Sequence, residues 1–202
     1  MTYRDVLLRP VVDADLAHLA AIEPADFEHD PALETFPALT PAADRARQLH
    51  QTHWRARGTW SPSSWTLDLA VVVTGRVAGV QFLEGEDFPR LRTVDSASWL
   101  EHPARGRGIG VAMRTAVLGL AFDHLGAAAA VTSARWDNHA SLGVSRRLGY
   151  RPNGVSLNAS PSGVVELTHL RLTRDDWLTS GLAGTVAVTG LEPCLPWFGL
   201  AP

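Results

Sequence analysis

The stretch "ARGRGIG", residues 104–110, places two arginines and three glycines within seven positions. It follows a predicted strand, "TVDSASWLE" (residues 93–101), and opens a predicted helix that stops at Gly126. Glycines let a backbone approach an anion closely, and the free N–H groups of a first helical turn attract negative charge. The turn therefore predicts a site for a pyrophosphate group.

Three kinds of phosphate site compete for this turn. A Walker A loop needs a lysine after its last glycine, and the chain contains no lysine. A dinucleotide fingerprint needs G-x-G-x-x-G, but counted from Gly106 and Gly108 the third position is Val111. The pattern [RQ]-x-x-G-x-[GA] is filled by Arg105, Gly108 and Gly110, and it suits coenzyme A. A flexible glycine turn without a ligand is the alternative to all three.

The composition is that of one ordinary domain. The 202 residues are 46% apolar and 19% charged, and a net charge of −3 argues against non-specific nucleic-acid binding. Cys194 is the only cysteine, which excludes an intrachain disulfide and a cysteine metal site. The first ten residues carry charges, and no apolar run reaches the ~18 residues of a membrane span. We therefore predict a cytoplasmic protein without membrane or nucleic-acid partners.

Hydrophobic periodicity and turn residues predict a strand and two helices, three strands, a helix, a strand, a helix and two strands. This order indicates a mixed α/β (α+β) fold around one sheet. The predicted strands cover residues 5–10, 65–73, 76–85, 93–101, 127–134, 150–158 and 164–172. The predicted helices cover residues 14–22, with Asp13 as N-cap, 41–58, 109–125, 139–148, with Asn138 as N-cap, and 174–178.

The last residues differ in character from the rest. Residues 1–180 form the predicted domain, and residues 181–202, "GLAGTVAVTGLEPCLPWFGLAP", are too apolar for a free tail. We expect this C-terminal extension to pack on the body or on a neighbouring subunit. A homo-oligomer is the corresponding expectation.

Three motifs together resemble one known family. "RGRGIG" after "SASWLE" looks like the acyl-CoA signature of the GNAT N-acetyltransferase superfamily. "NHASLGVSRRLGYRPNG" (residues 138–154) is similar to the second signature of its RimJ/RimL-like branch, N-x-x-S followed by [KR]-L-G-[FY]-x-x-x-G. "VELTHLRLTRDDW" (residues 165–177) resembles the final strand of that branch. The resemblance covers residues 3–178, with the motifs in the family's order and spacing.

The resemblance implies a mostly antiparallel sheet, splayed between its fourth and fifth strands and flanked by helices. It implies that the pantetheine arm of acyl-CoA lies in the resulting V-shaped gap. The implied acyl-CoA contacts are backbone groups near Trp99, Leu100 and His102, the amides of Arg105, Gly106, Arg107, Gly108, Ile109, Gly110 and Val111, and the side chains of Asn138, Ser141 and Arg147.

The resemblance also implies direct attack of an amine on bound acyl-CoA, which requires a base for the amine and a proton donor for the departing sulfur. Many family members donate that proton from a tyrosine at the position of Ser145, so the branch's serine, Ser141, is the expected donor. Glu166 is the expected base, because it matches an acidic position in the last strand. The other carboxylates on or beside the central strands are Glu84, Asp95 and Glu101, and proton transfer through water is also open.

The expected activity is therefore transfer of an acetyl group from acetyl-CoA to a primary amine of a protein N-terminus, a lysine or a small molecule. Succinyl-CoA is the alternative donor, and a non-catalytic acyl-CoA-binding module is the alternative class. His50 and His53 lie three residues apart on a predicted helix but have no adjacent carboxylate motif, so no metal site is expected.

Overall fold

A mixed sheet runs through the computed structural model, which describes residues 1–29, 33–160 and 163–200. Its strands are β1 (Thr2–Tyr3), β2 (Val6–Pro10), β3 (Ser64–Val73), β4 (Arg76–Glu86), β5 (Thr93–Asp95), β6 (Ser98–Leu100), β7 (Ala129–Arg135), β8 (Arg151–Ser160) and β9 (Gly163–Thr173). Their order is β1-β2-β3-β4-β5-β7-β9-β8, with β6 paired to β4 beside this path. Only the pairing of β5 with β7 is parallel within the described residues.

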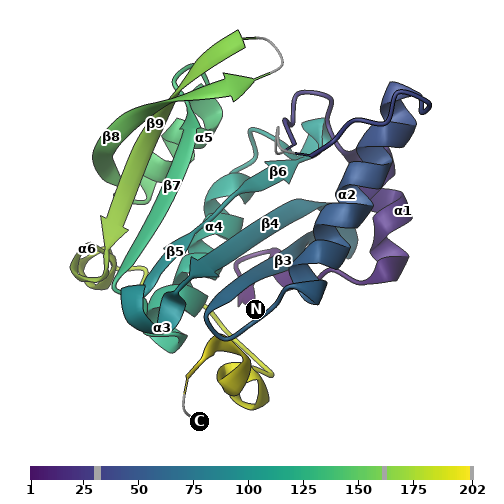
Figure 1. The fold of residues 1–202 in the computed structure, drawn as a ribbon. Helices are drawn as coiled ribbons and strands as arrows, with labels where there is room; N and C mark the ends of the chain where they lie inside the picture. Colours follow the sequence, from purple (N-terminus) through teal and green to yellow (C-terminus); the bar gives the residue numbers. More distant parts are fainter. Residues whose placement is uncertain (30–32, 161–162, 201–202) are drawn as a thin grey trace.

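Helices cover both faces of the sheet (Figure 1). They are α1 (Asp13–Ile22), α2 (Pro41–Gly58), α3 (Phe88–Leu91), α4 (Ile109–Gly119), which continues as a π-helical segment (Leu120–His124), α5 (His139–Arg147) and α6 (Arg174–Thr179). Two 3-10 turns, η1 (His102–Ala104) and η3 (Glu192–Phe198), complete the elements. Helices α1 and α2 lie on one face, and α4 and α5 lie on the other.

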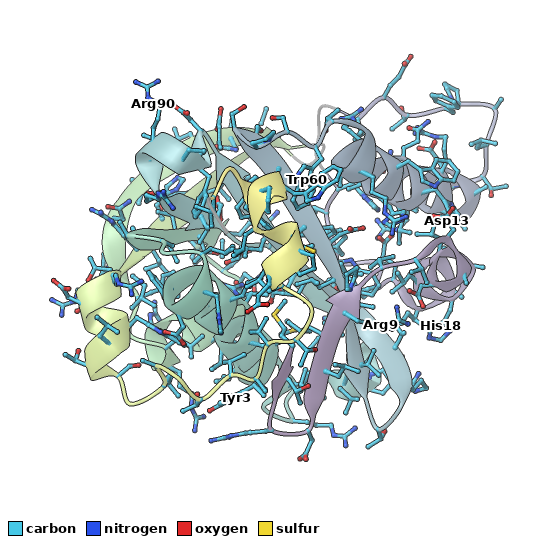
Figure 2. All side chains as sticks on the ribbon, turned by 90° about the horizontal axis from the view of Figure 1, so that it is seen from below. Tyr3, Arg9, Asp13, His18, Trp60 and Arg90 are labelled. Atoms are coloured by element: carbon cyan, nitrogen blue, oxygen red, sulfur yellow. The ribbon has the colours of Figure 1, made fainter. Side chains whose placement is uncertain are left out.

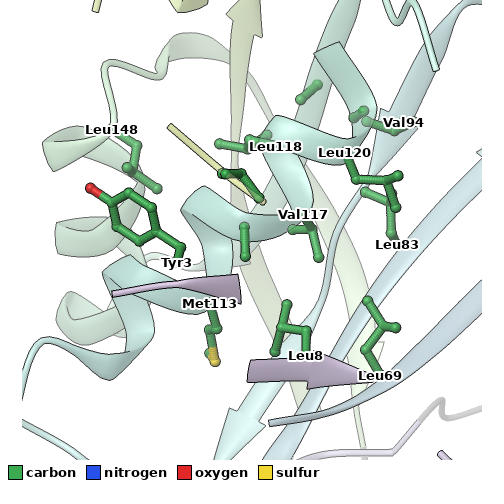
Figure 3. Close-up of a cluster of buried hydrophobic side chains, with 14 of the residues drawn as sticks. Tyr3, Leu8, Leu69, Leu83, Val94, Met113, Val117, Leu118, Leu120 and Leu148 are labelled. Carbon is green, nitrogen blue, oxygen red and sulfur yellow. The ribbon is translucent and has the colours of Figure 1, made fainter. Parts of the chain in front are cut away.

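Alternation along β4 explains the two layers, because successive side chains of a strand point to opposite faces. Leu83 points toward α4 and joins the larger core, where Leu8, Val117 and Leu118 are fully buried (Figure 3). Val80 points the other way and packs in the smaller core beneath α1 and α2. Both faces of the sheet are therefore covered with apolar side chains, as the predicted fold class requires.

The sheet splays where β5 and β6 separate. Strand β5 pairs with β7 over three residues, from Thr93 opposite Ala129 to Asp95 opposite Val131. Beyond that point β6 pairs with β4 alone, and β7 pairs with β9 alone. In Figure 1 the two halves of the sheet diverge from β5, with α4 behind the opening. The predicted splay between the fourth and fifth strands is confirmed, with the fourth strand divided into β5 and β6.

Hydrogen bonds stabilise the break between β5 and β6. The buried Gln81 donates from Nε2 to the carbonyls of Phe82 and Ala97, both at 2.9 Å. The N–H of Ser96 donates to Oδ1 of Asp95 at 2.6 Å, and Thr132 Oγ1 donates to the carbonyl of Ser96 at 3.0 Å. Side chains thus satisfy the peptide groups that leave the sheet here, so the prediction of one continuous strand over residues 93–101 was wrong.

Helix ends follow their capping residues closely. Helix α2 covers the predicted range, and Thr40 Oγ1 accepts the N–H of Ala43 at 3.3 Å before Pro41 opens the helix. Helix α1 begins one residue earlier than predicted, because Asp15 reaches back to accept the N–H of Val12 at 2.9 Å. The position predicted for the cap, Asp13, is the first helical residue.

Residues 181–200 of the C-terminal extension lie against the rest of the chain. Ala187 forms a bridge with Thr2, and Val186 packs on Gly119 of α4. Phe198 is buried against Trp60 and Trp65. Figure 2 shows this segment, in yellow, beside Trp60, whose Nε1 donates to the carbonyl of Trp197 at 2.7 Å. Contact with a neighbouring subunit stays a prediction.

Candidate active site

The glycine turn between β6 and α4 presents free backbone N–H groups. Gly106 and Gly108 have φ of +73° and +79°, a conformation that favours glycine, and open space surrounds both. The amides of residues 106–111 have no hydrogen-bond acceptor among the described residues. Those of 109–111 are free because they form the first turn of α4. These N–H groups are available to an anion at the positive end of the helix.

Arg105 anchors this turn instead of facing a ligand. Its N–H donates to the carbonyl of His102 at 3.1 Å, and its Nε donates to the carbonyl of Leu100 at 3.0 Å. Its two terminal nitrogens donate to the carboxylate of Asp26 at 2.6 and 2.8 Å, which holds the pKa of Asp26 below its usual value. The N–H and the guanidinium group of Arg105 therefore already have partners, so the expected contact of Arg105 with a pyrophosphate finds no support in this geometry.

Two further arginines are exposed: Arg107, expected to contribute its amide, and Arg147, expected to contribute its side chain. Arg107 in the turn and Arg147 at the end of α5 form no ion pair with any described residue. A Cβ atom at Gly110 would lie 3.3 Å from Val144, so the start of α4 packs on α5. His102 is exposed in η1 and contributes its carbonyl to the turn.

One edge of β6 faces the gap, and among the described residues only the carbonyl of Leu100 on that edge has a partner, the Nε of Arg105. The N–H of Phe82 donates to the carbonyl of Ala97 at 2.8 Å, so the peptide groups of odd-numbered residues here point toward β4. Peptide groups alternate in direction along a strand, so those of Ser98 and Leu100 point into the gap, and those of Trp99 do not. The expected backbone contact at Leu100 fits this register, the one at Trp99 does not, and Ser98 is a further candidate that the sequence prediction missed.

Helix α5 follows β7, the strand on the other side of the gap, and packs on the start of α4. Asn138 Oδ1 accepts the N–H of Ser141 at 3.0 Å, which confirms Asn138 as the N-cap. The hydroxyl of Ser141 is partly exposed and has no hydrogen-bond partner among the described residues. Ser145, at the family's tyrosine position, is buried and donates to the carbonyl of Ser141. Tyr150 lies in the core, where burial raises the pKa of its hydroxyl, so Ser141 is the accessible hydroxyl.

Two of the four candidate carboxylates are poorly placed to act as a base. The register puts Glu84 opposite Asp95, Asp95 opposite Val131, and Val131 opposite Arg171. Side chains alternate along β9, so the exposed Glu166 points to the face opposite Glu84. Glu101 is buried in an ion pair with Arg76. The expectation that Glu166 is the base therefore finds no support in this geometry.

Glu84 and Asp95 are two adjacent carboxylates beside the splay that have no cationic partner among the described residues. They are direct partners on neighbouring strands, and neither forms an ion pair within the described residues. Both are open to solvent yet surrounded by protein on most sides. Burial raises the pKa of Glu84, and the Asp95 charge raises it further; burial also raises the pKa of Asp95. A carboxylate with a raised pKa is suited to accept a proton.

A cavity of about 380 Å³ lies next to Glu84, between the sheet and helices α1 and α2. Apolar side chains from the helices and from β4 line it, among them Leu16, Leu49 and Phe82. Ala97 and Trp99 also line it, so the cavity reaches the break between β5 and β6 where the gap begins.

The segment after α1 spans this region. Asp26 binds Arg105 beside the glycine turn, and Glu28 accepts from Arg135 at the end of β7 at 3.0 Å. Between them, Phe27 packs on Trp99 with ring centroids 6.1 Å apart and lines the cavity. The segment thus closes one side of the cavity and links the two halves of the splayed sheet.

The sequence prediction did not find this cavity, although β4 carried a signal for it. Val80, Phe82 and Glu84 occupy every second position of the strand, so a carboxylate continues an apolar stripe that faces the helices. Such a residue is either paired or functional. The residues after α1 carried no comparable signal, because their positions depend on ion pairs with distant segments.

The histidines do not form a metal site in the described part of the chain, where no group of three or more His, Cys, Asp or Glu side chains could hold a metal ion. His53 hydrogen-bonds Asp68 through Nδ1, and His50 bonds the carbonyl of Ala46 at 2.7 Å. Among the described helices, none is both long and apolar enough to cross a membrane.

Comparison with known proteins agrees with this geometry. A family model described as an acetyltransferase (GNAT) domain matches residues 5–151. RimJ of Mycobacterium smegmatis, solved in complex with CoA-disulfide, is 19% identical with a TM-score of 0.72, over 88% of this chain and 86% of that chain. A GCN5-related N-acetyltransferase from Brucella melitensis is 18% identical with a TM-score of 0.67, over 88% and 80% of the two chains. A chimera of the Vibrio cholerae spermidine N-acetyltransferase SpeG and hSSAT is 10% identical with a TM-score of 0.68, over 87% and 99%.

Proposed function

Since the chain belongs to the GNAT acetyltransferase family, we propose that it is a RimJ/RimL-like enzyme that moves an acetyl group from acetyl-CoA to a primary amine, with Glu84 as the base. The observation that carries the proposal is that Glu84 and Asp95, two adjacent carboxylates without a cationic partner among the described residues, lie where the cavity meets the gap. An amine on the cavity side and a thioester on the gap side would meet there.

The groups around the gap fit an acyl-CoA co-substrate. The free amides of residues 106–111 suit its pyrophosphate, and the exposed Arg107 and Arg147 suit its phosphates. The peptide groups of Ser98 and the N–H of Leu100, which have no partner among the described residues, suit an amide-bearing arm laid along β6. Asn138 caps α5, the helix that follows β7 on the other side of the gap. When bound, acyl-CoA supplies an acyl group activated as a thioester.

Glu84 is proposed to accept a proton from the amine. A free alkylammonium has a pKa near that of lysine, ~10, so at neutral pH the amine arrives protonated and cannot attack. The carboxylate of Glu84 lines the cavity, and its raised pKa makes it a stronger base than an ordinary glutamate. Asp95 is a positioning residue here, because it does not line the cavity but its charge raises the pKa of Glu84.

Ser141 is proposed to donate a hydrogen bond or proton to the departing sulfur. Its hydroxyl is unpaired within the described residues and stands at the first turn of α5, the helix that follows β7. Direct attack by the amine needs no covalent acyl-enzyme. The only thiol of the chain, Cys194, lies in η3 of the C-terminal extension.

The experiment that tests this proposal is thiol release from acetyl-CoA in the presence of primary amines, with succinyl-CoA as the alternative donor. We expect amine-dependent release of one thiol per acetylated product, and slower release with succinyl-CoA. Binding of acetyl-CoA without turnover on small amines or on peptide N-termini would overturn the catalytic proposal. Faster turnover with succinyl-CoA would overturn the choice of donor.

A further inference from the structure

We infer that the acceptor is a monoamine whose apolar substituent fills the cavity beneath α1 and α2, with its ammonium group at Glu84. This inference rests on the proposed function, because it assigns the acceptor class of that same site. It is carried by the size of the cavity, by its walls and by the pairing of the charges around it.

The cavity is large enough for a ring or a branched alkyl group. Its volume is about 380 Å³, more than twice the ~150 Å³ void that holds benzene in an apolar protein core. Leu16 and Leu49 line it from the helices, and Val80, Phe82 and Trp99 line it from the sheet. Transfer of an apolar group from water into such a space is favourable in proportion to its buried area.

Four carboxylates line the cavity, and three of them already have partners. Glu23 accepts from Arg45 at 2.9 Å and from His29 at 3.0 Å. Glu28 accepts from Arg135 at 3.0 Å, and Asp68 is hydrogen-bonded by His53. Glu84 is the one lining carboxylate without an ion pair or hydrogen bond to a described residue.

This distribution provides one site for a cation, not two. The negative charge of Glu23 is matched by Arg45, although its Oε1 has no hydrogen-bond partner among the described residues. A second ammonium group inside the cavity would lose its hydration without gaining an unpaired carboxylate, which is unfavourable. A diamine or polyamine therefore fits worse than a monoamine with an apolar substituent.

The position of Glu84 gives the acceptor its orientation. Ala97 and Glu84 line the same cavity, and Ala97 lies two residues beyond Asp95, the strand partner of Glu84. An ammonium group at Glu84 is thus beside the break where the gap begins. The apolar substituent then extends away from the gap, between the helices and β4. A small arylalkylamine and a peptide with an apolar N-terminal residue share this chemistry.

The test compares kcat/KM for matched acceptors of the native protein with acetyl-CoA. The amine arm pairs 2-phenylethylamine with ethylamine and with spermidine, and the peptide arm pairs Phe-Gly-amide with Gly-Gly-amide. We expect the apolar member of at least one pair to be preferred about 10–100-fold, and spermidine to be used less well than 2-phenylethylamine. Equal use within each pair, or preference for spermidine, would overturn the inference and leave the proposed function intact. Absence of thiol release with every amine and peptide would instead overturn the proposed function.

A cavity-filling variant locates the preference. Val80→Phe should lower the ratio of kcat/KM for 2-phenylethylamine to that for ethylamine at least 10-fold. Val77→Phe is the matched control, because Val77 is on the same strand and does not line the cavity. An unchanged ratio in Val80→Phe would overturn the assignment. If Val80→Phe does not fold, 2-phenylethanol serves in the native protein. It should inhibit competitively against the amine, and absence of inhibition would overturn the inference.

Discussion

Replacing Glu84 by glutamine separates its proposed catalytic role from its effect on stability. The substitution keeps the shape of the side chain and removes its ability to accept a proton. General base catalysis raises a reaction rate about 10²–10⁴-fold, and water beside the solvent-exposed Glu84 can replace part of this effect. We therefore expect kcat for Glu84→Gln to fall about 10²–10³-fold, with a smaller change in the KM for acetyl-CoA because the glycine turn is untouched.

The same substitution should stabilise the fold at neutral pH. Like charges directly opposite on neighbouring strands cost about 0.2–1 kcal/mol, and solvent screening favours the lower part of that range. Burial raises the pKa of Glu84 and of Asp95, so the folded state holds their protons more tightly than the unfolded state. Their contribution to stability is present below the unfolded pKa values and is lost as pH rises through the raised values. Glu84→Gln should therefore raise the melting temperature at pH 7 by about 0.5–2 °C.

One further assay and one control complete this test. Thiol-release kinetics across pH should show kcat/KM of the native enzyme rising through a pKa above the ordinary 4.5 of glutamate, and Glu84→Gln should lack that limb. Glu166→Gln is the control, since Glu166 is an exposed carboxylate on the opposite face of the sheet. Native-like kcat in Glu84→Gln, or a large loss in Glu166→Gln, would refute the assignment of the base.

Three further perturbations address other parts of the structure. Gly108→Asp should abolish acetyl-CoA binding in a calorimetric titration. The control is Gly75→Asp, at φ +78° in the open turn before β4, which should lower stability to a similar extent and leave the affinity for acetyl-CoA unchanged. Equal losses of affinity in the two variants would contradict the pyrophosphate site at the glycine turn. Ser141→Ala should lower kcat about 10–100-fold with an unchanged KM for acetyl-CoA, and a native kcat would remove Ser141 from the mechanism. Phe198→Ala should destabilise the protein by about 3 kcal/mol in urea unfolding, because Phe198 is 4% exposed among aromatic rings; an unchanged midpoint would show that the extension adds no stability.

Local signals in the sequence were sufficient for most of the fold. The cap at Thr40 and the stop at Gly58 bound α2, and the glycine turn with the helix after it indicated a candidate phosphate site. The splay of the sheet was predicted from the family resemblance alone. In the structure, the side chains of Gln81 and Thr132 donate hydrogen bonds to the carbonyls of Ala97 and Ser96 at the break, and these partners are distant in sequence.

The candidate site was harder to predict because it depends on register and on pairing. Glu84 and Glu166 look equally plausible along the chain, and only the strand register places them on opposite faces. Arg105 matches the motif, but the distant Asp26 occupies its guanidinium group. Trp99 and Ser98 are adjacent, and only the alternation of hydrogen bonds decides which faces the gap.

A crystal structure with acetyl-CoA tests the central claim most directly. The account predicts pyrophosphate oxygens within hydrogen-bond distance of the amides of residues 106–111 and the pantetheine arm paired with Ser98 and Leu100. It also predicts the acetyl group beside Ala97, at the opening of the cavity that Glu84 lines. Acetyl-CoA bound outside the gap between β6 and β7, or with its acetyl group directed away from this cavity, would contradict the account.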